Sequence, residues 1–284
     1  MGLSNTKKGI LLGFAGYSFF SVSDACVKWL GSSYEETSIL FWVYSFVLAT
    51  CLILAFPQGI KNAYKTKTPF IHIARSIGMV SVGYCAISAL GGGLPLASLY
   101  TLIFLFPLIA AILAVPLYKE HVSRMSWIIL LMGFAGVIVA FHKDLTFSDP
   151  NLLYAFGALF FGTIVNFLAR PISKSDHVLT FPFYPGIVAI PLVFAYTHGN
   201  IAVPEMKDLP FFALSGICSC LAMICVLQAF RTAPYAIVSP SQYIQMLYGL
   251  VFGYLVFGDK PEAWMLVGAG MIIASGLLLI TQKK

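Results

Sequence analysis

Long apolar stretches, separated by short polar segments, make up nearly the whole chain. Most are close to the roughly 20 residues that a helix needs to span a bilayer. They lack the alternation of apolar and polar residues over about ten positions that a transmembrane barrel requires. The pattern therefore predicts ten transmembrane helices, the fifth of them short, at Gly9–Val27, Ser38–Phe56, Ile71–Leu90, Leu96–Leu117, Ser126–Phe141, Leu152–Ala169, Leu179–Thr197, Pro210–Phe230, Ala236–Phe257 and Ala263–Thr281.

The first stretch has some features of a signal peptide, because Lys7 and Lys8 precede it. It is longer than a typical apolar region of a signal peptide, and no convincing small-x-small cleavage site follows it. We therefore expect it to remain in the protein as the first span.

Composition supports a membrane environment. Of the 284 residues, 59% are hydrophobic and 10% are charged, with a mean hydropathy of +0.89. Soluble domains carry about 25% charged residues, so this chain cannot form a water-facing surface of ordinary polarity. We expect the lipid bilayer to surround most of the fold and leave no room for a soluble domain.

The distribution of lysine and arginine predicts the orientation of the chain. A cytoplasmic N-terminus places only Lys28, Lys143, Lys207 and Lys260 of the 17 cationic residues outside. Cytoplasmic loops carry the excess of positive charge in membrane proteins, so we predict both termini to be cytoplasmic in a bacterial inner membrane. The net charge of +6 then needs no nucleic-acid partner. The inner set is Lys7, Lys8, Lys61, Lys65, Lys67, Arg75, Lys119, Arg124, Arg170, Lys174, Arg231, Lys283 and Lys284.

The two halves of the sequence resemble each other. Because the matched positions include ionisable residues, which are rare in spans, we favour a true repeat over a chance likeness of apolar helices. Five spans per repeat would insert the second repeat upside down, as in many secondary transporters. We predict an all-α membrane protein with ten transmembrane helices in two inverted five-helix repeats, residues 1–145 and 146–284. Shifts of 142 and 139 positions pair Asp24 with Asn166, Lys28 with Arg170, and Glu120 with Asp259.

Several short motifs point to one family. They are Ser23-Asp24-x3-Lys28, Leu94-Pro95-Leu96-Ala97, Phe106-Pro107-Leu108, Ala233-Pro234 and Phe257-Gly258-Asp259. Together they resemble the EamA-type members of the drug/metabolite transporter superfamily, over nearly the whole chain. The resemblance implies ten spans and a substrate among amino acids, nucleotide-like metabolites, vitamins or drugs. The sequence departs from the family at Tyr44, because family members often carry an arginine within the second span.

Asp24 and Lys28 are the first candidates for substrate binding. A charge at the middle of the bilayer costs about 2.5–3.5 kcal/mol on insertion scales, so it suggests a function. Asp24 would bind a cationic group or accept a proton. Alternatively, it forms a structural pair with Lys28, one turn later on the same helical face.

Asn166 and Arg75 each have a functional and a structural interpretation. Asn166, the repeat counterpart of Asp24, would hydrogen-bond the substrate or join two helices. Arg75, near the inner end of the third span, would attract an anionic group or serve as a boundary charge.

The ninth span begins with an unusual group of polar residues, Gln242, Tyr243 and Gln245. The two glutamines are three residues apart and share a helical face, so we expect them to face a cavity or another helix. Tyr84 and Tyr100 would add aromatic walls to such a cavity, unless they belong to the core.

The sequence indicates no catalytic chemistry. It has no P-loop motif and no H-x3-H pair, and its six cysteines lie in apolar spans without C-x2-C spacing. We expect free packing thiols, no cofactor and no metal. We predict a secondary active transporter that moves an amino acid or a heteroaromatic, nucleoside-like compound by alternating access. A channel or an intramembrane enzyme is the alternative, and a homodimer is left open.

Overall fold

The structure is a computed structural model that describes residues 5–103, 105, 109, 124–140, 150–172, 176–233, 238, 241–242, 244–260 and 262–281. Among these residues are ten helices of at least eight residues, with a short 3₁₀ helix, η1 (Phe56–Gln58), and a short helix, α3 (Lys61–Tyr64). The ten are α1 (Asn5–Leu30), α2 (Glu36–Ala55), α4 (Pro69–Gly91), α5 (Leu96–Ile103), α7 (Arg124–Ala140), α8 (Pro150–Ile172), α9 (Thr180–Tyr196), α10 (Leu209–Thr232), α12 (Ile244–Phe257) and α13 (Ala263–Thr281).

Each of these ten helices overlaps one predicted span. The part of the fourth span after Ile103 falls almost entirely outside the described residues. In the ninth span, the described helix begins at Ile244, after a 3₁₀ turn at Ser241 and Gln242. The sequence pattern predicts a helix from Ala236; of residues 236–240 only Val238 is described, and it is helical, so the predicted start lies outside the described residues.

Four helices are long and apolar enough to cross a membrane by length and composition alone, namely those at Lys7–Leu30, Glu36–Ala55, Pro69–Gly91 and Leu209–Thr232. In α7, α8, α9, α12 and α13 the apolar stretches with described side chains are shorter, at 10–17 residues. Each of these helices packs on at least one helix of the other half.

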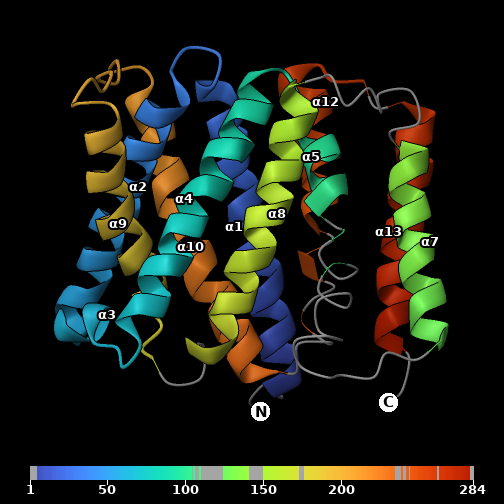
Figure 1. Ribbon diagram of the computed structural model, residues 1–284, viewed down its shortest axis with the longest axis horizontal. Helices are drawn as coiled ribbons and strands as arrows, with labels where there is room; N and C mark the ends of the chain where they lie inside the picture. The colour runs from blue at the N-terminus through green and yellow to red at the C-terminus, as the bar shows by residue number, and fades with distance from the viewer. Residues whose placement is uncertain are drawn as a thin grey trace.

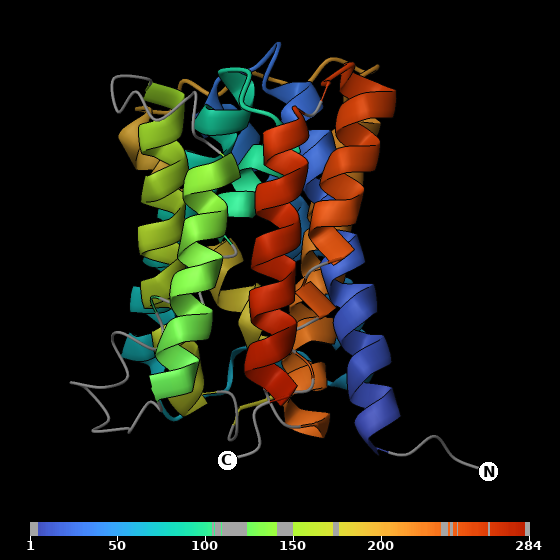
Figure 2. The same cartoon turned by 90° about the vertical axis from the view of Figure 1, so that its right-hand side faces the viewer.

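The two halves run in opposite directions through the bundle. Helix α1 rises from the lower to the upper end in Figure 1, whereas α8, its counterpart in the second half, descends. In the same way α4 rises and α10 descends. Helix α1 begins and α13 ends at the same lower end (Figures 1 and 2), as an even number of spans requires.

The packing of the helices follows this inverted symmetry. Helix α1 packs on α10, and the counterpart pair, α8 and α4, is also in contact. Helix α2 contacts α10 just as α9 contacts α4, and the pairs α2–α9, α5–α12 and α7–α13 each join equivalent helices. Exchange of the two halves therefore reproduces the main contacts. The fold is an all-α membrane bundle of two inverted five-helix repeats, with α7 and α13 side by side in Figure 2.

Glycines bring the paired helices close together. A Cβ atom at Gly16 of α1 would lie 2.6 Å from Cγ2 of Val226 on α10. A Cβ at Gly136 of α7 would lie 2.8 Å from the carbonyl oxygen of Gly268 on α13. Small residues at such positions allow the backbones of membrane helices to approach and gain van der Waals contact.

Candidate functional site

Two of the predicted site residues meet in the interior of the bundle. The hydroxyl of Tyr100, on α5, donates a hydrogen bond of 2.9 Å to Oδ2 of Asp24, on α1. The Tyr100 side chain is almost completely buried. A carboxylate has about four acceptor positions, so this bond orients Asp24 and leaves capacity for a cation or a proton.

A cluster of serines fixes α1 against α10 next to Asp24. The hydroxyl of Ser23 lies 2.8 Å from those of both Ser215 and Ser219 on α10. Ser21 donates instead to the carbonyl of Tyr17, one turn earlier in its own helix. The hydroxyl groups of these serines are used in hydrogen bonds between α1 and α10 or within α1. Asp24 is therefore the charged group on this part of α1.

Lys28 pairs with a residue that the sequence analysis did not consider as its partner. Its Nζ atom lies 2.6 Å from Oδ2 of Asp259 and 4.5 Å from the ring centroid of Phe257. The structural pair between Lys28 and Asp24, one of the two alternatives that the sequence left open, is not formed, since Lys28 pairs with Asp259 and Asp24 accepts from Tyr100. The ion pair connects α1 of the first half with the segment after α12 in the second half.

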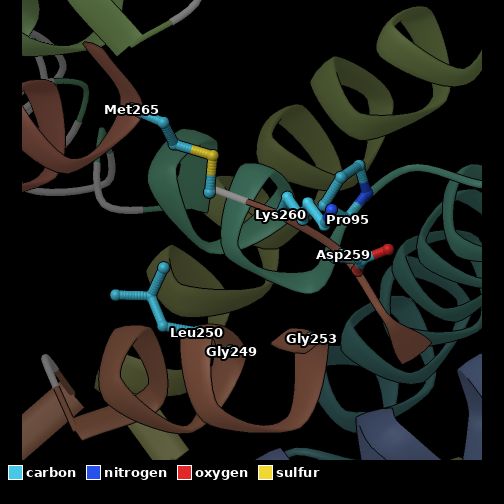
Figure 3. A pocket seen from close by; sticks show the side chains of 7 residues that line it. All are labelled: Pro95, Gly249, Leu250, Gly253, Asp259, Lys260 and Met265. Carbon is cyan, nitrogen blue, oxygen red and sulfur yellow. The ribbon is translucent and has the colours of Figure 1, made fainter. Parts of the chain in front are cut away.

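This ion pair borders a small cavity at the upper end of the bundle. The cavity has a volume of about 150 Å³ and lies between α12, the start of α5 and α13. Figure 3 shows the Met265 side chain reaching toward Lys260 and Pro95, with Asp259 on the non-helical segment after α12. Pockets that hold drug-sized ligands occupy about 300–1,000 Å³, so this cavity is too small to enclose a metabolite of that size. It is lined by Pro95, Gly249, Leu250, Gly253, Asp259, Lys260 and Met265.

The other aromatic and amide candidates are distributed over several helices. Gln245 is buried near the start of α12, and Gln242 is half-buried in the preceding turn. Tyr84, on α4, packs edge to face on Tyr154 of α8 at 6.2 Å between ring centroids, which makes it part of a helix contact. The side chain of Asn166, and Tyr243 as a whole, lie outside the described residues.

Arg75 lies inside the bundle, not at its boundary. Its side chain is 5% exposed, and its guanidinium lies 4.2 Å from the ring centroid of Phe181 on α9. Its Nε and Nη1 atoms are buried and have no hydrogen-bond partner among the residues that the structure describes. The interpretation as a boundary charge is therefore wrong, since such a charge would reach water. Sequence analysis missed Phe181 because an aromatic residue within a span gives no signal of its own.

A second polar cluster joins the two halves at the lower end. His72 Nε2, on α4, lies 2.7 Å from the carboxylate of Asp176, which also accepts from Thr66. Arg231, at the end of α10, donates to the carbonyl of Asp176. The His72 ring also stacks on Tyr184 at 4.4 Å between ring centroids. This cluster was not predictable from the sequence, because His72 lies near the start of a predicted span and Asp176 in a loop.

A counterpart of this cluster lies at the upper end. The Tyr34 hydroxyl donates to Asp208 at 2.9 Å and accepts from the amide of Glu205 at 3.0 Å. Partial removal from water, and the neighbouring Asp208 carboxylate, raise the pKa of the Tyr34 phenol, so it keeps its proton. Tyr34 and Asp176 are 142 positions apart, as are Thr66 and Asp208. The bonds Tyr34–Asp208 and Thr66–Asp176 are thus related by the repeat.

Among the residues described, no group of three or more His, Cys, Asp or Glu side chains is arranged to hold a metal ion. The six cysteines are free thiols, five of them buried.

These features define a class of protein. An apolar bundle of two inverted repeats, with a carboxylate and a guanidinium enclosed between its helices, is the architecture of a multi-pass membrane transporter. The sequence profile of the EamA-like transporter family matches residues 7–142 and again residues 150–281. The chain belongs to this family.

Relatives of known name are transporters, not enzymes. The S-adenosylmethionine uptake transporter of Rickettsia bellii is 24% identical over 268 residues, which cover 93% of this chain and 90% of the relative. The pseudopaline exporter of Pseudomonas aeruginosa is 23% identical over the full length of both chains. The riboflavin transporter of Rhizobium johnstonii is 23% identical and covers 93% of this chain and 88% of its own.

A solved structure has the same fold. A protein of known crystal structure superposes with a TM-score of 0.71 and 14% sequence identity, covering 96% of this chain and 97% of its own. At this level of identity the likeness concerns the fold alone.

Proposed function

We propose that the protein is a secondary active transporter that moves a small metabolite across the bacterial inner membrane by alternating access. The moving units would be the two halves, residues 1–145 and 146–284, with both termini in the cytoplasm. Membership of the EamA-like transporter family supports transport itself. The mechanism rests on the arrangement of the contacts between the halves.

The observation that carries the proposal is the pair of repeat-related bonds at opposite ends of the bundle. Tyr34 binds Asp208 at the upper end, and Thr66 binds Asp176 at the lower end. Each bond joins one half to the other. In an inverted repeat, the two halves can exchange conformations, so that one end opens as the other closes. Breaking these bonds in turn would then expose the interior to the two sides alternately.

The carboxylate of Asp24 supports a substrate that carries positive charge. An enclosed carboxylate favours a cation or a proton within its reach, because the low dielectric strengthens the interaction. S-adenosylmethionine, the substrate in the name of one relative, has a sulfonium, an amine and a heteroaromatic ring. We therefore propose a cationic or zwitterionic metabolite with an aromatic group, and S-adenosylmethionine as the first compound to test.

The test is counterflow in proteoliposomes that contain the purified protein. Vesicles loaded with unlabelled S-adenosylmethionine should accumulate the radiolabelled compound transiently and saturably. Asp24→Asn should lower this accumulation at least tenfold while the protein still inserts and purifies. Tyr100→Phe, which retains the ring and removes only the donor, should have a smaller effect in the same direction. Flux that does not saturate would indicate a channel and contradict the proposal.

A further inference from the structure

We propose that Arg75 is the anchor for a carboxylate of the transported substrate, at a subsite separate from Asp24. This inference rests on the proposed transport function and identifies the second charged group of the substrate. Its basis is a buried cation that has aromatic neighbours and, in the part of the chain that the structure describes, no anion.

Arg75 projects from α4 into the region where α2, α4 and α9 meet, since each pair of these helices is in contact. Phe181 lies under the guanidinium, and the Tyr44 hydroxyl donates to the carbonyl of Met79, one turn further along α4. Both aromatic side chains are buried. The charge is therefore enclosed on its sides by apolar rings.

The charge of Arg75 has no counter-ion in the described part of the chain. Its Nε and Nη1 atoms are without a hydrogen-bond partner, as is Nδ1 of the neighbouring His72. The carboxylate of Asp176, which belongs to the adjacent cluster, is bound to His72 and Thr66. Buried cations are almost always paired, and the ring of Phe181 is a weaker partner than a carboxylate.

The type of anion follows from the donor. The guanidinium is planar and always charged, and two parallel N–H groups match the two oxygens of a carboxylate. Nε and one Nη form one such pair of donors. Because Nε and Nη1 lie on different edges of the guanidinium, a carboxylate bound along one edge would satisfy one of these two unpartnered atoms together with Nη2.

Arg75 and Asp24 lie at different heights in the bundle. Helices α1 and α4 touch at their upper ends, where a Cβ at Gly31 would lie 2.9 Å from Cα of Gly91. Asp24 precedes Gly31 by seven residues, and Arg75 precedes Gly91 by sixteen. At 1.5 Å per residue, the Cα atoms of Asp24 and Arg75 are offset by about 14 Å along the two helices. The two residues therefore belong to separate subsites.

The first experiment needs no ligand. Unfolding of purified Arg75→Met, in the same detergent as the wild type, measures whether the guanidinium stabilises the empty protein. If Arg75 waits for a substrate anion, Arg75→Met should be at least as stable as the wild type, because methionine fills the space without an unpaired charge. The matched control is Lys28→Met, which removes a cation that has a partner and should lower stability. A loss of stability in Arg75→Met as large as in Lys28→Met would overturn the proposal.

The second experiment compares ligands that differ only in a carboxylate. S-adenosylmethionine is titrated against its decarboxylated form, and L-arginine against agmatine. Loss of a hydrogen-bonded charge typically weakens binding about ten- to a hundredfold. Within whichever pair it binds, the wild type should therefore bind the carboxylated compound tighter than the other by this factor. Arg75→Gln should reduce this ratio to about one. Asp24→Asn should weaken both members and leave the ratio unchanged.

These outcomes separate the two proposals. If the wild type binds neither pair, the proposed substrate class is wrong, and the unfolding comparison still decides whether Arg75 is structural. If the wild type binds a pair without preference for the carboxylate, or Arg75→Gln retains the preference, the anchor is not Arg75.

Discussion

The ion pair between Lys28 and Asp259 allows a quantitative test of how the two halves are held together. The pair is short, at 2.6 Å, and unequally enclosed, since the side chains of Lys28 and Asp259 are 8% and 24% exposed. Removing one partner of a fully buried pair costs about 3–5 kcal/mol, because the other charge is left without compensation. The cost should therefore depend on which charge remains.

Asp259→Ala leaves the more buried ammonium of Lys28 unpaired, although its contact with Phe257 persists. We expect a loss of about 3 kcal/mol in the free energy of unfolding. Lys28→Met leaves a carboxylate that retains access to water, and we expect a loss of about 1–2 kcal/mol. The double variant should lose less than the sum of the two, by a coupling energy of about 1–3 kcal/mol.

The measurement is a double-mutant cycle of unfolding free energies, determined by steric trapping in bicelles so that the protein remains in a lipid environment. Lys260→Met is the matched control. Lys260 follows Asp259 in the sequence and lines the same cavity. Because Lys260 is exposed, the loss of its charge should change stability by less than about 0.5 kcal/mol. A coupling energy below about 0.5 kcal/mol between Lys28 and Asp259, or an equal loss in the control, would refute the reasoning.

Three further predictions address gating, binding and orientation. Tyr34→Phe removes two hydrogen bonds between the halves, those with Asp208 and Glu205, and Thr66→Val removes the one with Asp176, each worth about 1 kcal/mol. The variants should shift thiol accessibility of the interior by about fivefold per bond, toward the upper side in the first and toward the lower side in the second, and equal labelling rates would exclude a gating role. Gln242→Leu should weaken substrate binding with little loss of stability, whereas Gln245→Leu, at a more buried position, should lower stability; thermal unfolding with and without substrate distinguishes the two. A cysteine in place of Lys65, on a cysteine-free background, should resist an impermeant reagent in intact cells and react in inverted vesicles; labelling in intact cells would reverse the orientation.

The general architecture was readable from the sequence because each element leaves a signal along the chain. Continuous apolar runs identified one described helix each, and the repeat between Asp24 and Asn166 indicated two related halves. At the start of the ninth span, the apolar run extends across Ser241 and Gln242, which form a 3₁₀ turn in the structure. Hydropathy reports burial in lipid and does not report local backbone geometry.

The pairing of charges could not be read in the same way. Asp24 and Lys28 have the spacing of a helical ion pair, but each finds a partner far away in the sequence, Tyr100 and Asp259 respectively. Local spacing predicts a pair only when no tertiary partner competes. The internal repeat was a better guide to the partner of Lys28, because it aligned Asp259 with Glu120 near the end of an equivalent span. A carboxylate at the same position in both repeats favours a role in contacts between the halves.

The positions of the polar bonds set an energetic requirement on any transport cycle. In this single structure, Lys28–Asp259 and Tyr34–Asp208 are formed at the upper end, and His72 and Thr66 bind Asp176 at the lower end. Opening either end must break bonds there, so the opened state is less populated unless something compensates. A ligand shifts such an equilibrium only by the difference in its affinity for the two states, and a change from 1:99 to 99:1 requires about 5.5 kcal/mol. Two charged contacts, one at Asp24 and one at Arg75, would each provide about 1.5–3 kcal/mol. A substrate that engages only one of them would therefore bind without driving a complete change of state, which is the physical reason to expect the transporter to select for both charges.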